Sequence, residues 1–179
     1  MQIDVHKDII EKCKKGNSQA QHKLYQLYAK AMYNTSYRMM NSQVEAEDML
    51  QEAFTEAFMK LETFRYDSTF GAWLKRIVIN KCINELKRKK ADLKLEEDMS
   101  MYNERKEEED VNAELNVDDV RRAMQQLPDG SRVIFSLYLL EGYDHREIAQ
   151  ILNVNEGTIH SRLSIARDRL RSILEASPS

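Results

Sequence analysis

The chain has 179 residues, of which 42% are hydrophobic and 32% charged, which is enough for one ordinary domain or two small ones. Apolar residues recur at helical spacing almost throughout and no run alternates for long, which excludes a strand-rich fold and predicts an all-α protein. The formal net charge of −3 does not exclude nucleic-acid binding, because the charge is distributed unevenly along the chain.

Three segments differ in charge. Residues 1–90 carry 16 basic against 11 acidic side chains, residues 91–119 carry 3 against 12, and residues 120–179 carry 8 against 7. The middle segment is poor in apolar residues and dense in like charge, so it cannot bury enough surface to order itself. We therefore predict two small helical domains, residues 1–90 and 118–179, joined by an acidic flexible linker over residues 91–117.

Four helices are predicted in the first domain. The first covers about Asp4–Lys15 and ends before a glycine, and the second covers about Ser18–Met40. The third opens with the capping-box pattern SQVE and covers about Ser42–Thr63. A loop with the sequence FRYDSTF, Phe64–Phe70, then leads into a fourth helix over about Phe70–Lys90. We refer to this connection as the 64–70 loop.

The third helix has two contrasting sides. Helical spacing places five apolar residues on one side: Ala46, Leu50, Ala53, Ala57 and Leu61. The opposite side is polar and mostly acidic: Asp48, Gln51, Glu52, Thr55 and Glu56. Taken alone, such an acidic face is most often solvated surface. Because no histidine or metal-binding pattern converges on it, we do not expect catalysis there.

The fourth helix is divided in the same way. A buried stripe is predicted from Trp73, Ile77, Val78, Cys82, Ile83 and Leu86. Arg76, Asn80, Asn84 and Lys87 recur at spacings that place them on one other face. This face combines amides with cations, and Glu85 is the only acid in the helix. These features favour contact with nucleic acid over simple exposure to solvent.

The 64–70 loop carries three aromatic residues among charges. Phe64, Tyr66 and Phe70 beside cations suit stacking on unpaired bases. The alternative is that Phe64, Phe70 and Trp73 are core residues, which is the interpretation we favour for Trp73. For the loop aromatics the sequence leaves both interpretations open.

Four helices are also predicted in the second domain. The first two cover Val117–Gln126 and Ser131–Leu140 and end at turn signals, LPDG and EG. The last two, Asp144–Leu152 and Glu156–Leu174, are separated by only three residues. Two helices joined by so short a turn are typical of a helix-turn-helix.

The inner face of this motif is apolar. It comprises Ile148, Ala149, Leu152, Val154 in the turn, Ile159 and Leu163, with Asp144 and Asn155 as N-caps. Near the start of the second helix the outward residues are Glu156, Thr158, His160, Ser161 and Arg162, with Arg167 further along as a phosphate contact. This end enters a major groove in DNA-binding members of the motif. The alternative is an ordinary helical hairpin, but the turn length and the small Ala149 favour DNA binding.

The cysteines and the termini indicate no further chemistry. Cys13 and Cys82 have no CxxC or Cys/His spacing, so we expect two reduced thiols, no metal and no cofactor. No segment has the length of a membrane span and no signal-peptide pattern opens the chain. We expect a cytoplasmic protein without membrane insertion, monomeric when free.

Three segments, in this order and spacing, resemble the sigma-70 family of bacterial transcription initiation factors: AEDMLQEAF (46–54), FRYDSTFGAWLKRIVINKCINELKRKK (64–90) and REIAQILNVNEGTIHSRLSIARDRLR (146–171). The extracytoplasmic-function (ECF) group, which keeps only the sigma-2 and sigma-4 domains, is the most similar. The resemblance implies a non-catalytic specificity subunit that binds core RNA polymerase and promoter DNA, with an anti-sigma factor as a further partner.

The resemblance also implies roles for individual residues. Core polymerase would be bound by Asp48, Gln51 and Glu52. The promoter's minus-ten element would be opened and held by Phe64, Tyr66, Asp67, Ser68, Thr69, Phe70, Arg76, Asn80 and Asn84. The minus-thirty-five element would be bound by Glu156, Thr158, His160, Ser161, Arg162 and Arg167. The linker would run toward the RNA exit channel.

Two positions depart from the family pattern. A lysine or arginine is expected where His160 stands, and an arginine where Ile165 stands. These departures affect the expected base preference and one expected phosphate contact, but not the apolar inner face. The competing hypotheses are a stand-alone helix-turn-helix regulator, which would bind duplex operator DNA without polymerase, and an enzyme, for which no catalytic cluster is present. The aromatic 64–70 loop favours the sigma factor, because a duplex-only regulator does not bind single strands.

Overall fold

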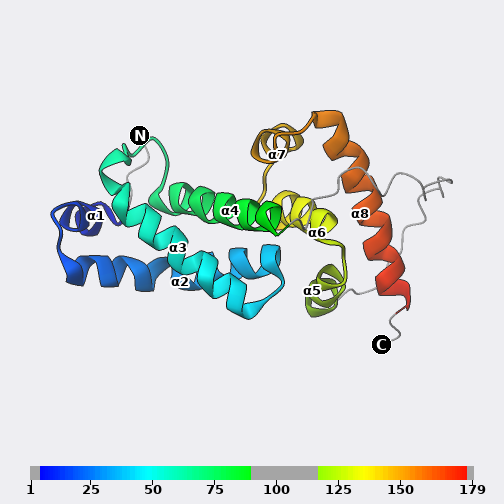
Figure 1. Ribbon diagram of the computed structural model, residues 1–179, viewed down its shortest axis with the longest axis horizontal. Helices are drawn as coiled ribbons and strands as arrows, with labels where there is room; N and C mark the ends of the chain where they lie inside the picture. The colour runs from blue at the N-terminus through cyan, green and yellow to red at the C-terminus, as the bar shows by residue number, and fades with distance from the viewer. Residues whose placement is uncertain (1–4, 90–116, 177–179) are drawn as a thin grey trace. The chain divides into compact units, whose positions relative to one another are not determined.

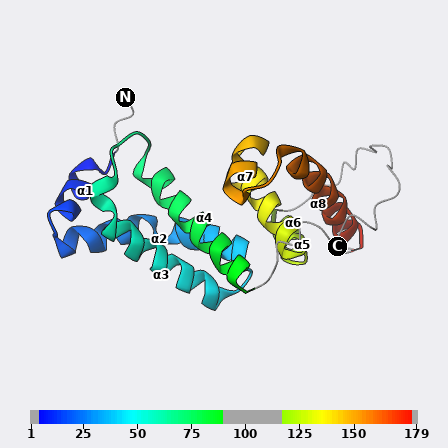
Figure 2. The same ribbon diagram turned by 45° about the horizontal axis from the view of Figure 1, so that its top comes forward.

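The structure is a computed structural model that describes residues 5–89 and 117–176. These residues divide into two compact units, with the division after Leu86. Every regular element in the described ranges is a helix, which confirms the all-α prediction (Figures 1 and 2). The predicted linker, residues 91–117, lies outside the described residues except for its last residue, which begins a helix.

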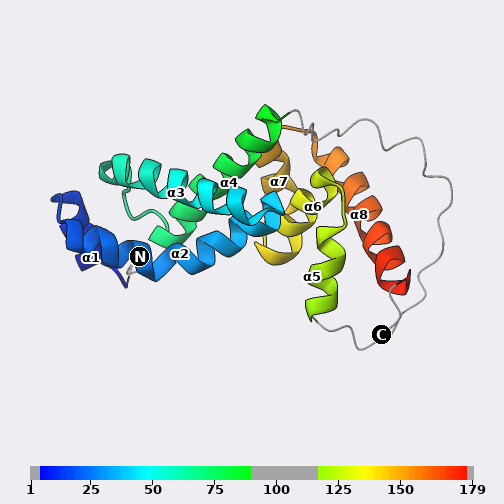
Figure 3. The ribbon, with the colours of Figure 1, turned by 60° about the horizontal axis from the view of Figure 1, so that its bottom comes forward.

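The first unit is built from four α-helices and one short 3₁₀ turn. In chain order they are α1 (Lys7–Lys14), α2 (Ser18–Met40), α3 (Gln43–Met59), η1 (Leu61–Thr63) and α4 (Phe70–Arg88). Helix α2 packs along α3 and α1 packs on α2 (Figures 1 and 3). The turn from α3 into α4 lies at the same end of the unit as α1, a placement that matters for the 64–70 loop.

Local sequence explains where these helices begin and end. The side chain of Asn17 accepts a hydrogen bond from the Ala20 amide at 2.9 Å and so caps α2. Asn41 adopts a left-handed backbone conformation that ends α2, and Ser42 caps α3 by accepting from the Glu45 amide. The two-residue connection turns α3 back along α2.

Two boundaries differ from the prediction. The third helix was expected to continue to Thr63, but α3 ends at Met59 and the chain tightens into η1. The first helix starts at Lys7 because the His6 carbonyl accepts the first two helical hydrogen bonds, from Ile9 and Ile10. Frayed and 3₁₀ ends of this kind are not encoded in apolar periodicity.

The core of the first unit confirms the predicted apolar side of α3 and most of the predicted stripe on α4, in which Trp73 and Ile77 are only half-buried. On α3 the side chains of Ala46, Leu50, Ala53 and Ala57 are buried, and so is Leu61 in η1. On α4 the buried residues include Val78, Cys82, Ile83 and Leu86, together with Phe70, Leu74 and Ile79. Each fully buried large side chain contributes about 1.5–3 kcal/mol of transfer free energy.

The second unit is organised around its last helix. In chain order it contains α5 (Val117–Gln125), α6 (Asp129–Phe135), a π-helical turn η3 (Ser136–Leu140), α7 (His145–Leu152) and α8 (Glu156–Ala176). Helices α5, α6 and α7 all pack on α8. The side of α8 that they cover carries Ile159, Leu163, Ala166 and Leu170, spaced as one helical stripe.

The turn between α5 and α6 corrects a predicted start. We expected the helix to begin at Ser131, after an LPDG turn, but α6 begins at Asp129, directly after Pro128. The Pro128 carbonyl accepts from the Arg132 amide at 2.9 Å. The Arg132 side chain, only 3% exposed, donates to the Leu127 carbonyl at 3.1 Å and to Asp129 at 2.6 Å. A buried arginine thus fixes this turn.

Candidate polymerase- and promoter-binding surfaces

Helix α3 presents an exposed acidic face, which we define as Asp48, Gln51, Glu52, Thr55 and Glu56. The first four are exposed and Glu56 is half-buried. The opposite side of the helix is the alanine-rich side that packs in the core. The predicted division of this helix into an apolar and an acidic side is therefore confirmed.

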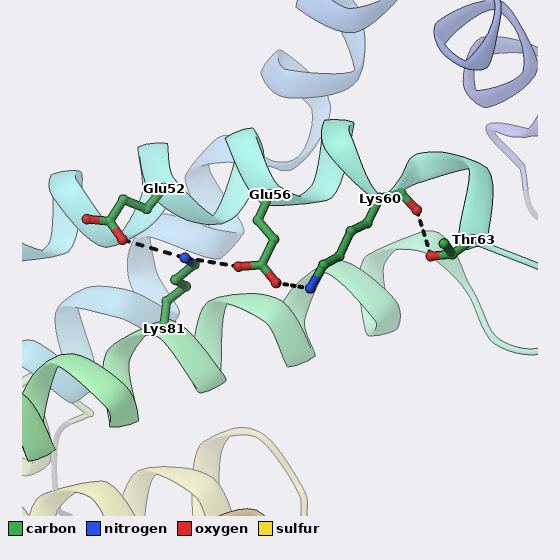
Figure 4. Close-up of polar contacts among 5 residues, drawn as sticks. All are labelled: Glu52, Glu56, Lys60, Thr63 and Lys81. Carbon is green, nitrogen blue, oxygen red and sulfur yellow. Dashed lines mark hydrogen bonds and ion pairs between the residues drawn. The ribbon is translucent and has the colours of Figure 1, made fainter.

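Part of the acidic face is paired with α4. Figure 4 shows Lys81 reaching from α4 toward the space between Glu52 and Glu56, with Nζ–Oε2 distances of 3.7 and 2.9 Å. Lys60 Nζ donates to Glu56 Oε1 at 2.6 Å. Hydrogen bonds from Lys60 and then Lys81 lower the pKa of Glu56, and the Glu56 carboxylate raises the pKa of Lys81. The side chain of Glu52 stays 57% exposed, so it is still accessible to a partner.

The 64–70 loop is shaped by an aromatic cluster beneath it. Phe64 is 3% exposed and Phe70 is 0% exposed. The Phe64 ring lies 4.7 Å from Tyr66, 5.7 Å from Phe70 and 5.3 Å from Trp73, measured between centroids. The sequence left open whether Phe64 and Phe70 are core residues or stacking surfaces. In this structure both rings are core, and Trp73 is half-buried beside them.

The polar residues of the loop have different environments. Arg65, Asp67 and Ser68 are exposed, while Tyr66 and Thr69 are half-buried. The Thr69 hydroxyl accepts from the Ala72 amide at 3.2 Å, so Thr69 caps the N-terminus of α4. The loop therefore exposes a short polar tip over a buried aromatic base.

Helix α4 continues from this loop with a polar face of opposite character to that of α3. Arg76, Asn80, Asn84 and Lys87 are all exposed, as the spacing predicted. The half-buried residues of this helix include Lys81, which faces α3. The polar face of α4 offers amide and cationic donors to a nucleic-acid chain and places no carboxylate among them.

The predicted helix-turn-helix is present as α7 and α8. Asp144 accepts from the Glu147 amide and the Glu147 carboxylate accepts from the Asp144 amide, both at 2.8 Å, which forms a capping box. Asn153 ends α7 with a left-handed backbone, φ 57°. Asn155 caps α8 by accepting from the Gly157 amide at 2.7 Å. Both predicted N-caps are confirmed. The predicted inner residues Ile148, Ala149, Leu152, Ile159 and Leu163 are buried, and Val154 in the turn is half-buried.

The start of α8 bears the residues predicted to contact DNA. Glu156, His160, Ser161 and Arg167 are exposed, whereas Thr158 and Arg162 are half-buried. The His160 ring lies 4.0 Å from the ring of His145 on α7, which stacks on Tyr138 at 5.1 Å. His160 therefore lies against α7, a contact that its outward position in the sequence pattern did not reveal.

The described parts of the chain were also compared with the patterns of a metal site, a reactive thiol and a membrane span. There, no three His, Cys, Asp or Glu side chains gather so as to hold a metal ion. Cys13 and Cys82 are both free thiols and buried, and burial raises the pKa of Cys82 to about 12. Within residues 5–89 and 117–176, no helix is long and apolar enough to cross a membrane.

Comparison with known families identifies both units. Residues 24–91 match the family described as Sigma-70 region 2, and residues 118–170 match Sigma-70, region 4. Helix α1 precedes the first matched range. The two matches together cover the α3 face, the 64–70 loop, α4 and the helix-turn-helix.

Comparison with individual proteins gives the same result. The chain is similar to the ECF RNA polymerase sigma factor SigW of Bacillus subtilis, with 31% identity in an alignment that covers 92% of this chain and 94% of SigW. It is 30% identical to the RNA polymerase sigma-H factor of Pseudomonas aeruginosa, over 93% of this chain and 92% of that protein. Among solved structures, the sigma factor RpoE in complex with the anti-sigma factor NepR from Bartonella quintana has the same fold, with a TM-score of 0.58, 23% identity and coverage of 88% of this chain and 98% of RpoE.

Proposed function

The chain belongs to the sigma-70 family, in its group of ECF RNA polymerase sigma factors, and on this premise we propose how its surfaces divide the work of promoter recognition. As a sigma factor the chain binds core RNA polymerase and directs promoter-specific initiation of transcription, through minus-ten and minus-thirty-five elements. The roles of individual side chains are the ones that the family resemblance implies for their positions, and for this chain they are proposals.

Core polymerase binds the acidic face of α3, through Asp48, Gln51 and Glu52. These side chains are exposed on a helix whose other side is locked in the core, so they form a rigid surface. Carboxylates repel DNA phosphates, and this face therefore suits a basic protein surface better than nucleic acid.

The minus-ten element is opened and held by the 64–70 loop and the polar face of α4. The exposed tip, Asp67 and Ser68 with Thr69 beside them, accepts an unpaired base, and Arg76, Asn80 and Asn84 contact the strand that carries it. Unstacking a base costs a few kcal/mol, roughly. Because Phe64 and Phe70 are buried, they support the loop from below, so the cost must be offset by polar contacts to the base and by phosphate contacts.

The minus-thirty-five element is bound by the start of α8. Glu156, His160 and Ser161 are exposed there, and Arg162 lies half-buried beside them. In a helix-turn-helix this end of the second helix enters the major groove, and Arg167 further along reaches a phosphate. The contact of His160 with His145 orients its ring, and so restricts which base edge it can reach.

The proposal also covers the partners of the chain and its location in the cell. The chain contributes recognition and no covalent chemistry, which core polymerase performs. It acts in the cytoplasm and is monomeric when free. An anti-sigma factor is a further partner, as NepR is for the RpoE of Bartonella quintana.

One observation carries this proposal. Two neighbouring helices of the first unit expose faces of opposite character: α3 exposes Asp48 and Glu52, and α4 exposes Arg76, Asn80 and Asn84. In a protein that bound DNA alone, the acidic face would only weaken the attraction to phosphate. A protein that bridges polymerase and DNA requires both faces.

The test is run-off transcription with purified core polymerase, the chain and fragments of genomic DNA. We expect transcripts that start at defined promoters only when the chain is present. Binding of the chain to the same fragments without core polymerase, combined with absence of transcripts, would instead support a stand-alone helix-turn-helix regulator.

A further inference from the structure

The 64–70 loop is held from helix α1, which lies outside the matched region 24–91. Tyr66 has a left-handed backbone, φ 62°, which is unfavourable for a bulky residue and persists only when surrounding contacts fix it. Its hydroxyl donates to Glu11 Oε1 at 2.6 Å. The Nζ atoms of Lys7 and Lys14 lie 5.4 and 4.9 Å from the centroid of its ring. The strained residue is thus fixed by three side chains of α1.

Lys14 joins these contacts to the loop backbone. Its Nζ donates to the Phe64 carbonyl at 3.1 Å and lies 3.4 Å from Glu11 Oε1. The side chain of Lys14 is only 14% exposed, so its contacts are less screened by water than those of a surface lysine. Glu11 and Lys14 together fix both the backbone and the side chain at the start of the loop.

The other end of the loop is also connected to α1, through α2. The Nδ1 atom of His6, which precedes α1, lies 2.8 Å from the hydroxyl of Tyr28 on α2. The Tyr28 ring meets Phe70 edge-on at 5.1 Å. Tyr28 also fits closely over Gly71, where an added Cβ would come within 3.0 Å of the ring. Both ends of the loop are therefore anchored, and the exposed residues of the loop are Arg65, Asp67 and Ser68.

We propose that helix α1 positions the 64–70 loop for capture of the unpaired base, with Glu11 and Lys14 as positioning residues. This inference rests on the proposed role of the loop in minus-ten recognition. The physical reason is preorganisation: a loop already held in its binding conformation loses less conformational entropy when it takes up a base. A loop released from α1 would relax the strained turn at Tyr66 and present its tip in many orientations.

The test measures base discrimination with the full chain bound to core polymerase. Fork-junction DNA carries either the preferred base or a substituted base at the captured minus-ten position. We expect Lys14→Ala and Glu11→Ala to lower the ratio of affinities for the two DNAs by roughly three- to tenfold, the loss expected for one or two such hydrogen bonds. Lys14→Arg keeps a cationic donor and should restore the ratio. Affinity for core polymerase should not change.

Two further variants distinguish positioning of the loop from general attraction to phosphate and from unfolding of the unit. Lys12→Ala removes the same charge from an exposed position of α1, and equal losses from Lys12→Ala and Lys14→Ala would overturn positioning in favour of general attraction to phosphate. Tyr66→Phe removes only the hydroxyl and keeps the ring packing, so it tests the Glu11 contact even where Glu11→Ala unfolds the unit. An unchanged ratio for both Tyr66→Phe and Lys14→Ala overturns the inference.

Failure of the proposed function gives a different pattern. Asp67→Ala and Ser68→Ala change the tip of the loop directly. If neither alters discrimination, the loop does not capture the base and the minus-ten assignment is wrong. If both alter it while the α1 variants do not, the assignment stands and only the positioning role of α1 is refuted.

Discussion

Charge reversal on the acidic face of α3 should separate polymerase binding from folding, provided that the residue is chosen from the structure. Glu52 lies 3.7 Å from Lys81, so Glu52→Arg replaces an ion pair by two neighbouring cations. Two unit charges 4 Å apart in water interact by about 1 kcal/mol, and an exposed ion pair contributes about 0.2–1 kcal/mol. Glu52→Arg should therefore lower the free energy of unfolding by about 0.5–2 kcal/mol. Asp48 is exposed one turn earlier, and Asp48→Arg should change it by less than about 0.5 kcal/mol.

Asp48→Arg should have a large effect on binding to core polymerase, although its effect on stability is small. Placing a cation opposite a basic partner surface costs several kcal/mol, so we expect Asp48→Arg to weaken binding by about 2–4 kcal/mol, or roughly 30- to 1,000-fold. The assay titrates core polymerase into the fluorescently labelled chain. Unfolding in urea is followed through Trp73, the single tryptophan of the chain, which reports on the first unit.

Glu62→Arg is the matched control for this experiment. Glu62 is an exposed acid in η1, off the acidic face, and its reversal changes the net charge by the same amount. We expect it to bind core polymerase as the unaltered chain does. Our reasoning is refuted if Asp48→Arg binds normally, or if Glu62→Arg loses as much affinity as Asp48→Arg does.

Three further predictions follow from individual contacts. Arg162→Ala should weaken the upstream promoter contact by about 1–3 kcal/mol and leave the downstream footprint intact; a lost downstream footprint would contradict the placement of α8. The buried Cys82 thiol, with a pKa raised to about 12, should react with thiol reagents at neutral pH only after unfolding in urea. Since hydrogen bonds lower the pKa of Glu56, its ionised form stabilises the fold above the ordinary pKa of 4.5, and the advantage is lost as pH falls through the lowered value. The difference in unfolding free energy between the chain and Glu56→Gln should therefore shrink below pH 4.5.

Periodicity and turn chemistry were sufficient to predict most helices and the direction of their faces. The predicted inner residues of the helix-turn-helix, such as Ile148 and Leu163, are buried, and so is the alanine side of α3. The caps Asp144 and Asn155 were readable because a capping side chain acts on residues within the next turn. These features are local, because each depends only on residues that are close together in the chain.

The partners of those faces were decided only by the tertiary structure. Sequence left the loop aromatics between core and surface, and Phe64 became core because Phe70 and Trp73 close around it. It gave no sign that Lys81 would lie between two acids of α3. The Tyr66–Glu11 hydrogen bond joins residues 55 positions apart. Helical period states which side of a helix is apolar, but which element covers that side, and which distant charges then meet, depends on how the helices pack.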